Sequence, residues 1–103
     1  MNIFKQLFSS TPAVDLSTLI KEGAFLVDVR TPGEFAEGHV KGSVNIPLDA
    51  VQAQLATFKN KKNIIVFCRS GGRSSQAKSI LEQNGFSNVV NGGTWMNVNQ
   101  FVK

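Results

Sequence analysis

The chain has 103 residues and is 42% hydrophobic and 17% charged, a balance typical of one globular domain and not of a disordered chain. No apolar run approaches the roughly 20 residues that cross a bilayer, so we expect no membrane-spanning segment. The net charge of +4 comes from scattered basic residues, densest at Lys59, Lys61 and Lys62. Scattered charge argues against a nucleic-acid partner and favours, at most, small anionic substrates.

The first residues form an extension, 1–12, ahead of a domain that we expect to cover about 13–103. Apolar residues in this extension recur at helical spacing rather than in the continuous block of a secretory signal, at Ile3, Phe4, Leu7 and Phe8. This pattern favours a cytoplasmic protein. After the extension, Val14 is a candidate start of a strand, and Asp15 is a candidate cap of a helix that stops at Gly23.

A strand, a helix and a second strand follow in the chain. Residues 24–29 form a continuous apolar run, which is typical of a strand buried on both faces of a sheet. Thr31, Pro32 and Glu34 then predict a helix start with a capping box. Residues 43–46 form the next short apolar run, which predicts another strand.

The second half of the chain continues the alternation of helices and strands. Its signals are, in order, a helix capped by Asp49 that carries Val51, Leu55 and Phe58, a strand at 63–67, a helix at 74–84 closed by Gly85, a weak strand at 89–90 and a short helix at 94–102. This order predicts a single α/β domain with a mostly parallel sheet.

The one cysteine, Cys68, and the one histidine, His39, limit the chemistry available to the chain. A single cysteine excludes a disulfide within the chain and a metal site built on several thiolates. We therefore expect neither a metal nor a cofactor.

The segment around Cys68 carries the chemistry. An apolar strand runs into Cys68, a loop of Arg69, Ser70, Gly71 and Gly72 follows, and Arg73 opens a helix. In parallel sheets ligands bind at the carboxyl ends of strands, where glycines let backbone N–H groups converge on one point. The helix start and the two arginines favour a thiolate, so we expect a lowered pKa and a nucleophilic sulfur. The alternative is an anion-binding loop in which the cysteine only packs.

The length of this loop separates two kinds of cysteine chemistry. Phosphatases that use a thiolate need an arginine six positions after the cysteine to surround a phosphoryl group. Here Ser74 holds that position and Arg73 comes one residue earlier. The shorter ring of amides fits one extra sulfur atom on Cys68 better than a phosphoryl group.

The ordered set of motifs resembles a single-domain rhodanese, a thiosulfate sulfurtransferase-like protein. The matching segments are Asp28-Val29-Arg30 with Glu34-Phe35, Gly38-His39, Gly42, Asn45-Ile46-Pro47, the loop from Cys68 to Ser74, and Phe86, Val89 and Asn91-Gly92-Gly93. One departure is Trp95, which lies closer to the paired glycines than the family pattern has it. The resemblance implies a three-layer fold with a central, mostly parallel five-stranded sheet and helices on both faces.

The resemblance also implies a reaction cycle. Cys68 would take the outer sulfur of a donor such as thiosulfate, hold it as a persulfide among the loop amides, and pass it to cyanide or another thiol. Arg69 would attract the sulfonate of the donor, whereas Arg73 would either brace the loop or contact substrate. The hydroxyls of Ser70 and Ser74 would donate to the sulfur, or Ser74 would simply cap the helix.

Three further polar residues have supporting roles in this interpretation. Asp28 would hold Arg73, Arg30 or the loop amides rather than act as an acid. Arg30 would pair with Glu34, and His39 would form scaffold hydrogen bonds rather than take part in catalysis.

The alternatives keep the same residues but change the role of the chain. A persulfide carrier would deliver the sulfur of Cys68 to a protein thiol, and a rhodanese-like binding module would carry no sulfur at all. An arsenate reductase or phosphatase is disfavoured by the short loop. For the leading sulfurtransferase hypothesis we expect a monomer whose partners are a small anionic donor and a small or protein thiol acceptor.

Overall fold

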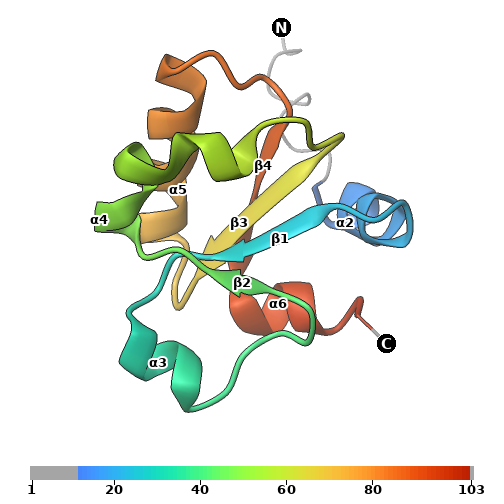
Figure 1. Cartoon of the computed structure of the whole chain (residues 1–103). Helices are drawn as coiled ribbons and strands as arrows, with labels where there is room; N and C mark the ends of the chain where they lie inside the picture. The colour runs from blue at the N-terminus through green and yellow to red at the C-terminus, as the bar shows by residue number, and fades with distance from the viewer. Residues whose placement is uncertain (1–11, 103) are drawn as a thin grey trace, which may run out of the picture.

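The structure is a computed structural model that describes residues 12–102, with the backbone alone for residues 12–15. The apolar residues of the N-terminal extension lie outside the described residues. The elements are, in order, α2 (Pro12–Lys21), β1 (Phe25–Asp28), α3 (Pro32–Ala36), β2 (Val44–Asn45), α4 (Leu48–Val51), the 3-10 helix η1 (Gln52–Phe58), β3 (Ile64–Cys68), α5 (Gly72–Gln83), β4 (Val89–Thr94) and α6 (Trp95–Asn99) (Figure 1). No helix within 12–102 is long and apolar enough to span a bilayer.

The strands form one parallel sheet in the order β2-β1-β3-β4. Residues 12–102 contain four strands and not the expected five, because the chain around Val14 is helical. The registers align the carboxyl ends of the strands: Asp28 pairs with Asn45 and with Phe67, and Cys68 pairs with Thr94. Polar and sulfur-bearing residues that lie far apart in the sequence are thereby gathered at one edge of the sheet.

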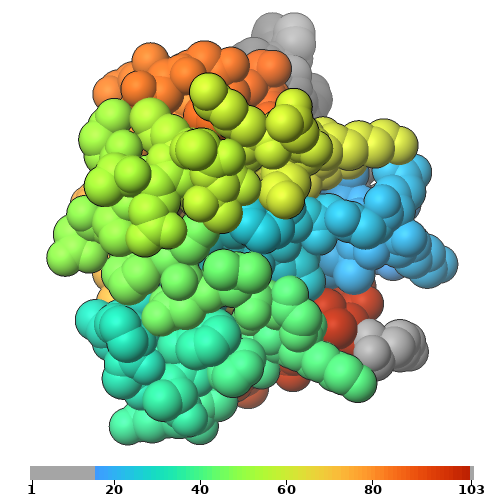
Figure 2. All heavy atoms as spheres, in the orientation of Figure 1, coloured from blue at the N-terminus to red at the C-terminus, as the bar shows by residue number. Residues whose placement is uncertain are grey.

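Helices cover both faces of the sheet, as the continuous apolar strands predict. Val66 and Cys68 of β3 face one core, which α4, η1 and α5 close with side chains such as Phe58 and Leu81. Ile65 and Phe67 face the other core, which α2 and α6 close. Figure 1 shows these two helical layers on either side of the sheet, and Figure 2 shows the atoms of α4 and η1 covering one face.

The α2 helix corrects two expectations at the start of the domain. It begins at Pro12, so the predicted strand at Val14 and the predicted cap at Asp15 are wrong. Proline favours the first turn of a helix, where its missing N–H has no intrahelical partner to lose.

The segment after β2 also differs from the prediction, since one helix capped by Asp49 is replaced by two. Pro47 holds the N-cap position without a side-chain hydrogen bond, and the chain leaves helical geometry at Gln54. Leu55 and Phe58 are three residues apart, which suits the three-residue turn of a 3-10 helix and directs both toward the same core.

Two helix ends follow the predicted signals and one does not. Thr31 and Glu34 form the capping box at the start of α3, and Gly85 follows the end of α5 with φ +94°. The α5 helix begins at Gly72 with Gly71 as its N-cap, so Ser74 does not cap it. Ser74 lies inside the first turn and is fully buried.

The C-terminal elements begin nearly where the sequence predicts them. The β4 strand is longer than the predicted 89–90, and its pairing with β3 contains an irregularity between Val66 and Phe67. The α6 helix ends at Asn99 and is shorter than the predicted 94–102, with Thr94 as its cap.

Candidate active site

The sulfur of Cys68 lies at the centre of a small cradle formed by the loop between β3 and α5. The backbone N–H groups of Gly71 and Ser74 donate to Sγ, at 3.0 and 3.4 Å, and the thiol is 3.5 Å from Oγ of Ser74. Gly71 has φ +102°, a conformation that side chains other than glycine adopt at a cost. The neighbouring Gly72 has no positive φ, because the turn is made at Gly71.

Burial and hydrogen bonding act on this sulfur in opposite directions. Burial raises the pKa of the Cys68 thiol, but hydrogen bonds from the Ser74 side chain and from the backbone N–H groups of Ser74, Gly71 and Ser70 outweigh it. The pKa is therefore lowered, as the sequence predicts. These hydrogen bonds, rather than the charges of the two loop arginines, are the main causes.

Cys68 is completely buried. Three residues of the loop, Arg69, Ser70 and Gly72, are exposed above it. The side chain of Cys68 therefore has no exposed surface, whereas the loop that follows it does.

Arg73 braces the loop through α3 and not through the sulfur. Its guanidinium forms two hydrogen bonds with the carboxylate of Glu34, at 2.7 and 3.0 Å. Glu34 also accepts from the backbone N–H of Thr31, and together these bonds lower its pKa to about 2. This ion pair joins α3 to the start of α5, between residues that are 39 positions apart.

Asp28 and Arg30 form a second, buried ion pair beside the cradle. The guanidinium of Arg30 donates to both oxygens of Asp28 and to the carbonyl of Gly38, the last at 2.8 Å. Arg30 lies only two residues past Asp28, and its side chain folds back to reach that carboxylate. The predicted Arg30–Glu34 pair is therefore wrong. The indole of Trp95 lies over this guanidinium, 4.7 Å from it, and packs against Gly38.

His39 lies beside α3, away from the sulfur. Its Nδ1 is 2.8 Å from the carbonyl oxygen of Phe35, and its ring stacks on the Phe35 ring with centroids 3.7 Å apart. These contacts agree with a scaffold role for the histidine.

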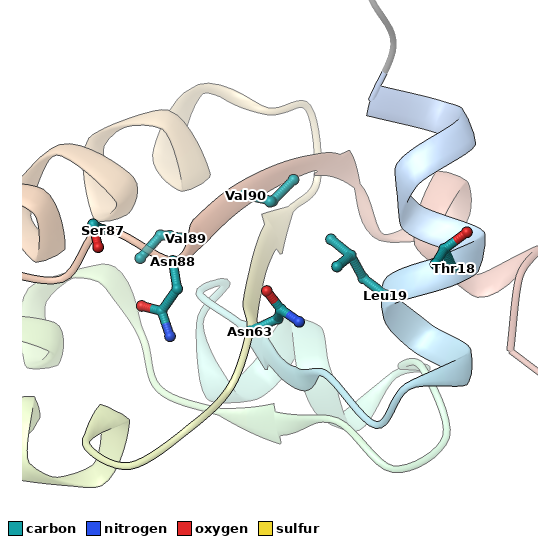
Figure 3. A pocket seen from close by; sticks show the side chains of 7 residues that line it. All are labelled: Thr18, Leu19, Asn63, Ser87, Asn88, Val89 and Val90. Carbon is teal, nitrogen blue, oxygen red and sulfur yellow. The ribbon is translucent and has the colours of Figure 1, made fainter.

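A hollow of about 400 Å³ opens beside the loop, lined by both charged and apolar side chains. These include Arg69, Glu37, Trp95 and the exposed Met96. Arg69 lines this hollow, and it makes no ion pair with the carboxylates of residues 16–102. A separate hollow of about 320 Å³ lies between α2 and the amino ends of β3 and β4; its side chains, such as Leu19, Asn63 and Asn88, include no titratable group (Figure 3).

Asn91 is the site residue that sequence reasoning missed. Oγ of Ser74 donates to Oδ1 of Asn91 at 2.7 Å, and the backbone N–H of Gly93 donates to the same oxygen at 2.9 Å. The signal available in the sequence was an asparagine before two glycines at the end of a strand, a pattern typical of an irregular strand end.

Comparisons with known proteins agree with this geometry. The family model for the "Rhodanese-like domain" matches residues 12–94. "Thiosulfate sulfurtransferase PspE" of Escherichia coli strain K12 is 42% identical over 69 residues, covering 65% of this chain and 66% of that protein. "Sulfurtransferase" of Allochromatium vinosum is 34% identical over 70 residues, covering 68% of this chain and 65% of that protein. The aligned part thus spans about two thirds of each curated relative.

A solved structure described as "rhodanese with anions from E. coli" has the same fold. It superposes with a TM-score of 0.66 at 38% identity, covering 73% of this chain and 91% of that chain.

Proposed function

The chain belongs to the rhodanese family, and on that premise we propose that it transfers sulfane sulfur from a donor such as thiosulfate to a thiophilic acceptor through a persulfide on Cys68. The observation that carries the proposal is the set of N–H groups from Gly71 and Ser74 that point at one buried sulfur. A sulfur so placed is stabilised both as an attacking thiolate and as a leaving thiolate.

Cys68 has opposite roles in the two half-reactions, since it is the attacking thiolate in the first and the leaving thiolate in the second. In the first, the Cys68 thiolate attacks the outer sulfur of thiosulfate, the S–S bond breaks, and its electron pair leaves with sulfite. In the second, the acceptor attacks the outer sulfur of the persulfide, and the electron pair of that S–S bond returns to Cys68. No proton acceptor is needed when donor and acceptor are both anions.

The mouth of the cradle fits a small anionic donor. Arg69 is exposed, borders the hollow beside the loop and is free of the carboxylates of residues 16–102, so it is available to a sulfonate. Arg73 serves the loop instead, because both of its terminal nitrogens are held by Glu34.

Intact mass spectrometry tests the proposal directly. Incubation with thiosulfate should add about 32 daltons, the mass of one sulfur atom, and cyanide should remove it. Cys68→Ser should show no gain. A protein that stays unmodified with thiosulfate and with a persulfide donor would contradict sulfur transfer and favour a binding module.

A persulfide carrier is the second candidate function. Met96 is 63% exposed at the rim of the hollow beside Arg69, an apolar feature that a protein acceptor could cover. A carrier would load sulfur on Cys68 but pass it slowly to cyanide and quickly to a protein thiol such as reduced thioredoxin. A cytoplasmic location and a monomeric state remain predictions of the sequence.

A further inference from the structure

The hydroxyl of Ser74 has one hydrogen and three acceptors around it. Oγ lies 2.7 Å from Oδ1 of Asn91, 3.1 Å from the carbonyl oxygen of Gly71 and 3.5 Å from Sγ of Cys68. A hydroxyl donates one hydrogen bond at a time, so these acceptors compete for the same hydrogen. Ser74 is fully buried, so the competition among these acceptors is not relieved by solvent at the hydroxyl.

Asn91 is the strongest competitor while the sulfur is neutral. Its oxygen is the nearest to Oγ, and it is fixed in place by the N–H of Gly93 two residues further on. In this state the Cys68 S–H donates to Oγ of Ser74, and the Ser74 hydroxyl donates to Oδ1 of Asn91. The two hydrogen bonds form an ordered chain. An anionic sulfur reverses the preference, because charged acceptors form the stronger hydrogen bonds.

We propose that Asn91 is a positioning residue that holds the hydroxyl hydrogen of Ser74 away from Cys68 while the sulfur is uncharged and releases it when the sulfur becomes an anion. For sulfur transfer, and resting on the proposed function, the device distinguishes two states of the same atom. The inner sulfur of a persulfide is uncharged, so the hydroxyl stays on Asn91. When the acceptor takes the outer sulfur, Cys68 leaves as a thiolate and gains the hydroxyl as a third donor. Stabilisation that appears only as the charge develops is the kind that accelerates a reaction.

The surrounding charges do not produce this effect. The charged groups around the loop and its hollows are Asp28, Arg30, Glu34, Glu37, Asp49, Arg69 and Arg73, and α5 carries Lys78 and Glu82 further from the loop. The β4 strand, which carries Asn91, contains none. Substitutions at Ser74 and Asn91 therefore change donors and acceptors at the sulfur while leaving the charges around it in place.

The test measures the acid dissociation constant of the Cys68 thiol from the pH dependence of its alkylation by iodoacetamide. Asn91→Ser keeps an oxygen that can accept from the N–H of Gly93 but withdraws it from Ser74. It should raise the dissociation constant about three- to tenfold, because the hydroxyl then gives up only its longer hydrogen bond, to the carbonyl oxygen of Gly71, when it turns to the thiolate. Ser74→Ala should lower the constant. The double variant should match Ser74→Ala, because Asn91 influences the sulfur through that hydroxyl rather than through the contact of its Nδ2 with the carbonyl oxygen of Gly71, at 3.5 Å.

Two results would overturn the inference. One is a dissociation constant that falls or stays unchanged in Asn91→Ser; the other is an equal effect of Asn91→Ser in the Ser74→Ala background, which would indicate a structural role of the β4 turn. If Asn91→Ser fails to fold, Asn91→Ala gives the same comparison. Alkylation requires no sulfur donor, so failure of the persulfide experiment alone would refute the proposed function and leave this inference standing.

Discussion

Gly71→Ala offers the sharpest test of the cradle, with Gly72→Ala as its matched control. An added Cβ at Gly71 has room, since its nearest neighbour would be the Cα of Gly93 at 3.7 Å. The penalty comes from φ +102°, which costs an L-residue about 1–2 kcal/mol. Gly72 lies outside that region with open space around it, so alanine there should leave stability unchanged or raise it by up to about 1 kcal/mol.

The loop of the Gly71 variant can either keep its shape or relax, and the two responses change different measured quantities. If the loop keeps its shape, the free energy of unfolding in urea should fall by about 1–2 kcal/mol while the pKa of Cys68 stays low. If the loop relaxes, the Gly71 N–H leaves Sγ, and loss of a hydrogen bond to a charged acceptor, about 1.5–3 kcal/mol, should raise that pKa by roughly one to two. Iodoacetamide kinetics and urea unfolding measure both quantities. Identical results for the Gly71 and Gly72 variants would refute the cradle.

Three further predictions concern the core, the brace and the mouth. Gly92→Ala should destabilise the fold by about 1–3 kcal/mol, because its Cβ would lie 2.6 Å from Cγ2 of Val98; Val98→Ala in the same chain should recover part of the loss in urea unfolding, and no recovery would count against the clash. Hydrogen bonds from Arg73 hold the pKa of Glu34 at about 2, below its usual value, so the stability they give is complete above about pH 4.5 and is lost as the pH falls toward 2. The gap in urea midpoint between the wild type and Glu34→Gln should therefore be wider at pH 5 than at pH 3, and a constant gap would argue against the ion pair. Arg69→Ala should slow sulfur loading from thiosulfate about tenfold or more but barely affect an uncharged persulfide donor, and equal losses would remove the role of its charge.

The sequence was informative where structure is determined locally. A strand, Cys68 and a glycine-containing loop before a helix are neighbours in the chain, so their geometry follows from local rules, as does the capping box of Thr31 and Glu34. The turn itself shows the limit of such rules. Two adjacent glycines could each supply a positive φ, and only the packing of the loop assigns it to Gly71.

Contacts between distant segments were harder to predict. The pairing of Glu34 with Arg73 instead of Arg30 depends on where α3 packs against α5, which no spacing in the sequence reveals. The contact between Ser74 and Asn91 depends on the register of β4 beside β3, including the irregularity after Val66. The absence of a fifth strand from residues 12–102 has a local cause instead, because the single apolar signal at Val14 lies within a helix that begins at Pro12.

The internal pairing of the arginines has a consequence for turnover. Arg30 pairs with Asp28 and Arg73 with Glu34, whereas Arg69, at the rim of the hollow, pairs with none of the carboxylates of residues 16–102. In the proposed reaction, a sulfonate attracted to Arg69 would therefore meet no second unpaired arginine within residues 16–102 that would also retain the sulfite product. Product release would be fast and end-product inhibition weak, at the price of loose affinity for the incoming anion.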